Sequence, residues 1–274
     1  NQFIMIRYFI LLTLLFHYNL YSQDIFAEKE RFTRQDSLRG SITEERSWWD
    51  LVYYHLDIKI EPDKKFIEGH NTVKFQVIEE NQVMQIDLQE PLRITRVQEN
   101  GKNLKYTREG NVYLIYLDKK QIVGEVNEIK ISYKGKPKVA VRAPWDGGFS
   151  WDKDENGNHF IATSCQGLGA SVWWPNKDHM YDEVDSMLIS VNIPRELVNV
   201  SNGRLKEITY PDDETITYHW FVSNPINNYG VNVNIGDYVK FSEIYNGEKG
   251  NLDIDYYVLR YNKEKAKVHF EDVP

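Results

Sequence analysis

Apolar and polar residues alternate along most of the chain from residue 51 onwards. In the segment 51–61 every second residue is apolar and would lie on one face of a strand: Val52, Tyr54, Leu56, Ile58 and Ile60. A period of two is typical of a strand with one buried face. The residues PDKK at 62–65 favour a turn, and the alternation resumes over 67–77. We therefore predict a β-hairpin over 51–77.

Short apolar runs of the same kind continue along the chain. They lie at 83–88, 92–97, 104–107, 112–117, 127–133, 187–193, 214–222, 231–235, 237–244 and 252–260. Turn-forming pairs such as Asn100-Gly101 and Asn202-Gly203 separate them. No long segment with the helical period of 3.6 residues accompanies them. The pattern predicts an all-β fold, built as a multi-sheet β-sandwich or as layered sheets.

The first 23 residues have a different pattern. Met5 and a single arginine precede an apolar run from Tyr8 to Phe16, and polar residues follow. This order is typical of a secretory signal peptide. The run is shorter than the roughly 20 apolar residues that span a bilayer, so an uncleaved membrane anchor is the less favoured alternative. We expect an exported protein, periplasmic or extracellular, with no transmembrane span in the mature chain.

The remaining segments set the expected domain boundaries. Residues 24–46 are polar and charged, which favours a linker or an arm on the surface. The strand-rich unit occupies 47–245. Residues 246–274 contain one more alternating strand and then KEKAKVHFEDVP, which resembles the opening of a helix. We interpret this last segment as the start of a further domain.

The amino-acid composition excludes several classes of function. The chain has 274 residues, of which 41% are hydrophobic and 14% aromatic, and its formal net charge is −8. Such a chain can bury a core, and the acidic balance without a basic cluster argues against a nucleic-acid partner. Cys165 is the single cysteine, which excludes an intrachain disulfide and a multi-cysteine zinc site. We expect a buried, inert thiol there.

The histidines do not form a recognisable zinc motif. No two of the seven lie four residues apart, so no H-E-x-x-H pair exists and we predict no metal within this sequence. The segment 152–163 resembles the first half of a calcium loop, with suitable residues at positions 1, 3, 5 and 6: Asp152, Asp154, Asn156 and Gly157. Its twelfth residue is Thr163 rather than a bidentate Glu. A polar hairpin with Gly157 at positive φ is the favoured interpretation.

Four tryptophans lie close together in the sequence: Trp145, Trp151, Trp173 and Trp174. Exposed indole rings on a β-sandwich can stack on sugars, which would make the chain a carbohydrate-binding module. The alternative is that these large rings fill a core, as such residues commonly do.

The segment 145–194 carries a resemblance to a known family. It contains the strand HFIAT, the glycine-rich turn Gln166-Gly167-Leu168-Gly169, the aromatic corner Trp173-Trp174-Pro175, Asn176-Lys177-Asp178 and an alternating strand. In this order and spacing the sequence resembles the N-terminal domain of the aminopeptidase N family of zinc metallopeptidases, of the gluzincin type. The resemblance extends from Ser47 to Tyr245.

The resemblance implies a saddle of β-sheets that packs on a thermolysin-like catalytic domain and forms one wall of its active site. By this resemblance Gln166 contacts the α-amino group of a peptide substrate with a free N-terminus. An amide oxygen can accept a hydrogen bond from an ammonium group. Gly167 would allow a substrate to approach closely. The alternative is that both residues serve only the turn.

The sequence also departs from the family pattern. Family members carry a G-x-M-E-N-like loop and H-E-x-x-H with a downstream Glu, and none of these is present here. We therefore expect no catalytic residue and no cofactor within this segment, with zinc held by the catalytic domain of which 246–274 would be the start. A scaffold of a catalytically dead relative is the remaining alternative.

Overall fold

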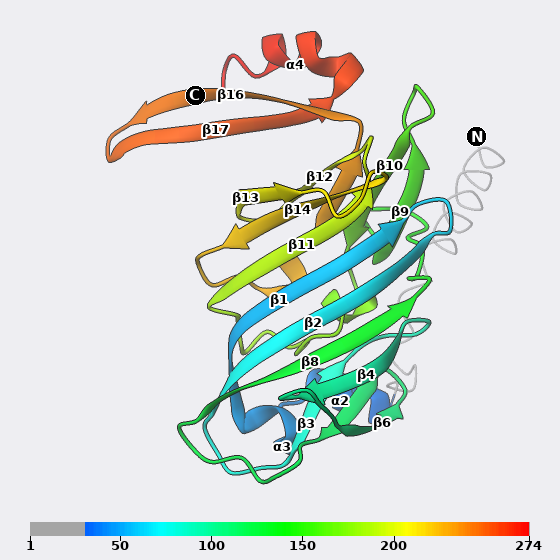
Figure 1. The fold of residues 1–274 in the computed structure, drawn as a ribbon, viewed down its shortest axis with the longest axis vertical. Coiled ribbons are helices and arrows are strands. Elements are labelled where there is room, and N and C mark those ends of the chain that lie inside the picture. Colours follow the sequence, from blue (N-terminus) through cyan, green and yellow to red (C-terminus); the bar gives the residue numbers. More distant parts are fainter. Residues whose placement is uncertain (1–30, 274) are drawn as a thin grey trace, which may run out of the picture. The chain divides into compact units, whose positions relative to one another are not determined.

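The structure is a computed structural model that describes residues 31–273. Within these residues the predicted β-rich fold is confirmed, since strands of four sheets make up most of the elements (Figure 1). The predicted signal peptide, residues 1–23, lies outside the described residues.

The largest of the four sheets has eight strands. In spatial order it contains β13 (Arg204–Thr209), β14 (Thr215–Val222), β11 (Ser186–Pro194), β1 (Trp49–Glu61), β2 (Phe66–Val77), β8 (Val126–Gly135), β4 (Arg93–Glu99) and β5 (Lys102–Asn103). The antiparallel pair β1 and β2 is the predicted hairpin. On its other side β1 pairs in parallel with β11, which brings residues far apart in the sequence into one sheet.

The alternation in β1 determines which face is buried, with one exception. Tyr54, Leu56 and Ile58 are fully buried, as the period of two predicts. Val52 was expected on the same face but is only half-buried, and Leu51 is buried instead. The register with β2 shifts between Leu51 and Tyr53. A bulge at this point inserts one residue, so the alternation changes phase there.

Three smaller sheets complete the strands. They are the three-stranded sheet β3 (Val83–Asp87), β7 (Val112–Tyr116) and β6 (Lys105–Glu109), the four-stranded sheet β12 (Val198–Ser201), β15 (Val233–Gly236), β10 (His159–Ser164) and β9 (Gly148–Lys153), and the hairpin β16 (Tyr238–Gly247) with β17 (Gly250–Leu259).

Sequence patterning missed β12 and β13. In β12 the buried residue is Asn199, whose Oδ1 accepts a hydrogen bond from the Trp220 indole at 3.1 Å. In β13, at the edge of the large sheet, most side chains are exposed. β13 therefore shows no apolar alternation that could reveal it, and the alternation Val-Asn-Val-Ser of β12 is only four residues long and buries a polar residue.

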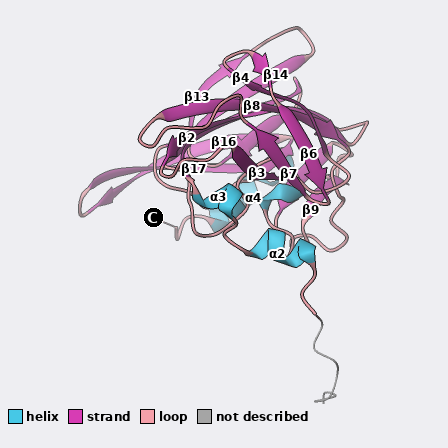
Figure 2. Ribbon diagram, turned by 90° about the horizontal axis from the view of Figure 1, so that it is seen from below, coloured by secondary structure: helices cyan, strands magenta, loops and turns pink. Residues whose placement is uncertain are grey.

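The helices are short: α2 (Arg34–Gly40), α3 (Glu44–Ser47), η1 (Ala170–Val172), η2 (Asn228–Gly230), η3 (Arg260–Asn262) and α4 (Lys263–His269). Figure 2 shows α2 and α3 beside the strands, within the segment for which the sequence indicated only a polar arm. Leu38 and Arg46 of this segment are buried. None of the helices in residues 31–273 is long and apolar enough to cross a membrane.

Candidate functional site

The glycine-rich turn that follows β10 is the centre of the candidate site. The backbone N–H groups of Leu168 and Gly169 both donate to the carbonyl oxygen of Cys165, at 3.1 and 2.8 Å. These bonds close a tight turn in which Gly167 has φ +72°. Gln166 and Gly167, the two residues singled out from the sequence, are both exposed on it. Both residues are therefore accessible from solvent.

The Gln166 side chain has one partner that the sequence did not indicate. The hydroxyl of Tyr229 donates a hydrogen bond to Oε1 of Gln166 at 2.5 Å. Tyr229 lies on η2, and its backbone N–H donates to the Asn227 side chain at 2.9 Å. The two residues are 63 positions apart, so no local motif could have paired them.

Side chains from two other segments hold the backbone of the turn. Arg39 of α2 donates from Nη2 to the carbonyl oxygen of Gly167 at 2.9 Å. The amide of Gln89 donates to the carbonyl oxygen of Leu168 at 2.6 Å and to the hydroxyl of Ser171 at 2.9 Å. A small polar pocket of about 170 Å³ lies beside these contacts, with Arg39, Gln89 and Ser171 among its walls.

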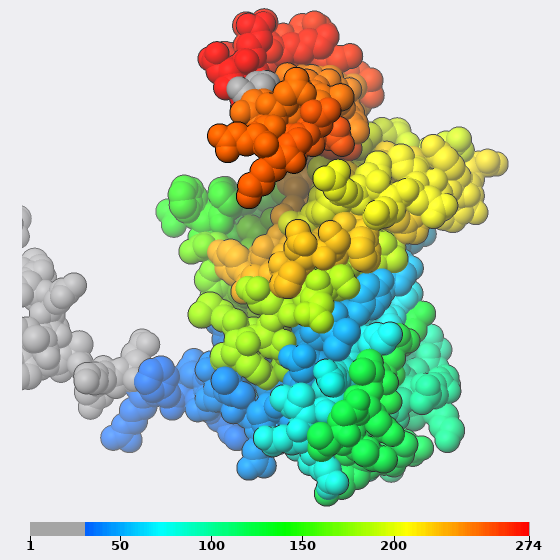
Figure 3. All heavy atoms as spheres, turned by 90° about the vertical axis from the view of Figure 1, so that its left-hand side faces the viewer, coloured from blue at the N-terminus to red at the C-terminus, as the bar shows by residue number. Residues whose placement is uncertain are grey.

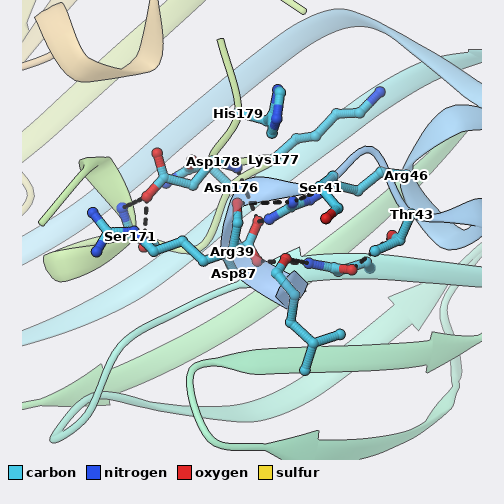
Figure 4. Close-up of polar contacts among 12 residues, drawn as sticks. Arg39, Ser41, Thr43, Arg46, Asp87, Ser171, Asn176, Lys177, Asp178 and His179 are labelled. Atoms are coloured by element: carbon cyan, nitrogen blue, oxygen red, sulfur yellow. Dashed lines mark hydrogen bonds and ion pairs between the residues drawn. The ribbon is translucent and has the colours of Figure 1, made fainter. Parts of the chain in front are cut away.

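Asp178 caps the backbone that leaves the turn. Its carboxylate accepts hydrogen bonds from the N–H groups of Ala170 and Ser171, at 3.2 and 3.0 Å, and from the Ser171 hydroxyl at 2.6 Å (Figure 4). Gly169 has φ +82°, and a Cβ there would lie 2.4 Å from Oδ2 of Asp178. Glycine is therefore required at 169 both for the backbone conformation and for the close approach of the carboxylate.

A buried ion pair connects the turn to α3 and β3. Oδ2 of Asp87 accepts from Nη2 of Arg46 at 2.7 Å and from the backbone N–H of Asp178 at 3.0 Å (Figure 4). Gln85 donates to the other oxygen of Asp87 at 2.9 Å. Burial raises the pKa of the Asp87 carboxyl, while the Arg46 guanidinium opposes this shift. Through Asp87 this ion pair attaches the backbone of Asp178 to the core.

Lys177 is the second buried charge of this segment. Its Nζ donates to Oδ2 of Asp182 at 2.5 Å and to the carbonyl oxygen of Trp49 at 2.6 Å. The same atom lies 4.0 Å from the centre of the Trp49 ring. Burial lowers the pKa of Lys177 to about 8, against the attraction of Asp182. Since Lys177 is fully buried, its ammonium group contacts core residues and does not reach a surface ligand.

The tryptophans do not form a sugar-binding platform. Trp173 and Trp174 are 0% exposed, and Trp174 packs edge-on against Tyr54 with 5.1 Å between ring centres. Trp151 stacks on Phe149 at 4.8 Å, and Trp145 alone of the four is well exposed, at 76%. The expected exposure of Trp173 and Trp174 for sugar stacking is therefore wrong, and these large rings fill the core, as the alternative interpretation held.

The calcium-loop-like segment and the single cysteine both have structural roles. The segment 152–163 forms the β9–β10 hairpin, in which Asp154 accepts from the N–H groups of Asn156 and Asn158 and Gly157 has φ +84°. This confirms the polar hairpin. Cys165 is buried, and burial raises the pKa of its thiol to about 12, which keeps it protonated and unreactive.

The described residues do not fit a zinc ion. Across residues 31–273 no three His, Cys, Asp or Glu side chains come together in a way that could hold a metal. A zinc site of the kind found in peptidases needs three protein ligands at one point.

Solved structures show the same fold. An M1 zinc metallopeptidase from Deinococcus radiodurans, in a complex with a Tyr-Ser-Ala substrate, matches with a TM-score of 0.66 and 16% identity over 79% of this chain and 49% of that one. Leukotriene A4 hydrolase from Saccharomyces cerevisiae matches with a TM-score of 0.62 and 15% identity, over 82% of this chain and 33% of that one. The chain thus spans half or less of either protein.

Sequence comparison identifies the family. No curated protein sequence matches the chain significantly. The model of the Peptidase M1 N-terminal domain matches residues 51–229, which is well over half of the chain and agrees with the resemblance seen in the sequence. The chain therefore belongs to the family of Peptidase M1 N-terminal domains.

Proposed function

We propose that this chain is the noncatalytic N-terminal domain of an exported zinc aminopeptidase. In this proposal the domain packs on a catalytic domain and forms one wall of its active site. The catalytic domain removes N-terminal residues from peptides, and zinc bound there polarises the scissile carbonyl and activates water. Export is proposed from the order of residues 5–23, and the zinc ligands are proposed to lie outside the 274 residues.

The observation that carries the proposal is the exposed amide oxygen of Gln166. An amide oxygen has two lone pairs, and Tyr229 occupies one of them. The second can accept a hydrogen bond from the ammonium group at the N-terminus of a peptide. Because the turn is fixed to the core through Asp178 and Asp87, the backbone that carries Gln166 has a defined position.

The position of the amine determines which peptide bond is cleaved. A peptide held by its ammonium group places its first carbonyl at a set distance from Gln166, whatever residues follow. Such orientation supplies a large part of the rate enhancement in enzymes. Gly167 has no atom within 4 Å of the place where a Cβ would be, so the path beside Gln166 is open. The arrangement favours removal of a single residue.

Kinetics of a Gln166→Ala variant test the proposal in the full-length enzyme. We expect KM for peptides with a free amine to rise and kcat/KM to fall, by about 1–3 kcal/mol in transition-state stabilisation, because a hydrogen bond to a charged group is lost. Gln166→Glu would keep an acceptor at this position and retain most of the activity. Both variants are measured with an aminoacyl-4-nitroanilide and with a free peptide.

Gln76→Ala serves as the matched control, because Gln76 is an exposed glutamine on β2. It should leave kcat and KM unchanged. Wild-type kinetics in Gln166→Ala would limit Gln166 to its role in the turn and contradict the proposed amine contact. A full-length protein without bound zinc and without activity would instead identify a catalytically dead relative.

A further inference from the structure

The hydroxyl of Tyr229 has a single hydrogen-bond partner among residues 31–273, and that partner is Gln166. The tyrosine ring is 50% exposed, so it contributes little to the core. Both the hydroxyl and the Gln166 amide lie on exposed residues. The contact therefore joins two surface side chains from separate elements, at the place where the substrate amine is proposed to bind.

Asparagine side chains fix the backbone that carries Tyr229. Asn228 is buried, and its Nδ2 donates to the carbonyl oxygen of Lys177 at 2.8 Å and to Oδ1 of Asn176 at 3.3 Å. Asn227 caps η2 by accepting from the N–H of Tyr229 at 2.9 Å. The helical turn η2 is thus attached to the segment that continues from the Gln166 turn. The Tyr229 hydroxyl is held at a defined point and not on a free loop.

We infer that Tyr229 is a positioning residue for the amine-binding site, an inference that rests on the proposed function of Gln166. A glutamine amide can turn either its oxygen or its NH₂ group toward a ligand. Only the oxygen accepts a hydrogen bond from an ammonium group, and the NH₂ group repels it. The Tyr229 hydroxyl donates a hydrogen bond to Oε1, and this bond holds the oxygen, rather than the NH₂ group, on the Tyr229 side of the amide.

The hydrogen bond between Oη of Tyr229 and Oε1 of Gln166, 2.5 Å long, also holds the two side chains together in the absence of a ligand. Because the two side chains are ordered before the peptide arrives, less conformational entropy is lost on binding.

Removal of the hydroxyl alone tests the inference. In the full-length enzyme Tyr229→Phe should raise KM for a free-amine substrate by about 3- to 10-fold, the effect of one lost hydrogen bond, with kcat changed by less than about 2-fold. The melting temperature should stay unchanged, because the ring and its packing remain. Tyr210→Phe, at an exposed tyrosine that follows β13, is the control and should alter neither quantity.

A double-mutant cycle separates this inference from the proposed function. If Tyr229 acts through Gln166, adding Tyr229→Phe to Gln166→Ala should raise KM no further. An unchanged KM in Tyr229→Phe, with a raised KM in Gln166→Ala, would overturn the role of Tyr229 and leave the amine contact of Gln166 intact. Fully additive effects would also overturn it. Wild-type kinetics in Gln166→Ala would overturn the proposed function and this inference together.

Discussion

Arg46 and Asp87 show how single residues outside any motif determine the geometry of the site. Both are buried, and their side chains meet at 2.7 Å. Arg46 also donates to the carbonyl oxygens of Arg39 and Ser41, which ties α2 to α3. Asp87 in turn accepts from the backbone of Asp178, the residue that caps the end of the glycine-rich turn. One ion pair thus connects the helical segment, β3 and the turn that carries Gln166.

Replacement of Arg46 by alanine should therefore be strongly destabilising. It leaves the Asp87 carboxylate buried without its charge partner, which typically costs about 3–5 kcal/mol of unfolding free energy. Urea denaturation of the chain measures this loss. Arg93→Ala, at an exposed arginine on β4, should change the unfolding free energy by less than about 0.5 kcal/mol. A loss below about 1 kcal/mol in Arg46→Ala would show that the pair is not needed for the fold.

The close approach of β1 and β2 makes a glycine necessary in the middle of β2. A Cβ on Gly69 would lie 2.1 Å from the carbonyl oxygen of Asp57 and 2.7 Å from Cα of Ile58. Both atoms belong to the backbone of β1 and cannot rotate away, so the strands must separate to admit a methyl group. We expect Gly69→Ala to reduce the unfolding free energy by about 1–3 kcal/mol.

Gly40→Ala is the matched control for this substitution. No atom lies within 4 Å of the place where its Cβ would be, at the end of α2. Thermal unfolding of the two variants should therefore differ clearly, with Gly40→Ala close to wild type. Equal melting temperatures would contradict the tight approach of the two central strands.

The outer face of the same strands brings two histidines together. The rings of His55 and His70 lie 6.1 Å apart, and Nε2 of His55 is 3.0 Å from the Ser190 hydroxyl. Burial lowers the pKa of both histidines from the ordinary value of 6.5. As pH falls below about 6.5, the unfolded chain takes up protons at these positions more readily than the folded chain does. Their protonation therefore favours unfolding.

A double variant, His55→Gln with His70→Gln, tests this effect. We expect the wild-type chain to lose more unfolding free energy between about pH 7.5 and about pH 5 than the variant does, since the variant lacks both titrating groups. Urea denaturation at the two pH values gives the comparison. The same loss in both proteins would mean that the histidines do not contribute to acid sensitivity.

The elements differ in how far the sequence could predict them. The alternation in β1 and β2 follows directly from one buried and one exposed face, so the hairpin could be predicted. The bulge near Val52 could not, because it depends on the register with β2. Gln166 was predicted as a site residue from the resemblance of its segment to the family. The contact of Tyr229 with Gln166 could not be predicted, because it forms only when η2 packs on the segment after the turn, and no local pattern encodes it.

At the scale of the molecule, the C-terminal elements differ from the rest. The hairpin β16–β17 pairs with no other strand among residues 31–273, and Ile244, Leu252 and Val268 are well exposed. Figure 3 shows the hairpin in orange beside the yellow strands, and a groove of about 1070 Å³ lies between the hairpin and β13–β14. The predicted domain boundary at 245/246 falls inside β16. Under the proposed function, the catalytic domain covers the exposed side chains of Ile244, Leu252 and Val268.

The most direct test measures two properties of the full-length protein. The first is its zinc content, and the second is its rate of cleavage of one peptide with a free and with an acetylated N-terminus. We predict about one catalytic zinc per chain and release of the first residue from the peptide with a free amine. The same peptide with an acetylated N-terminus should be cleaved far more slowly, because it lacks the ammonium group that Gln166 is proposed to bind. Equal cleavage of the two forms, or a protein with neither zinc nor activity, would contradict the proposed role of this domain.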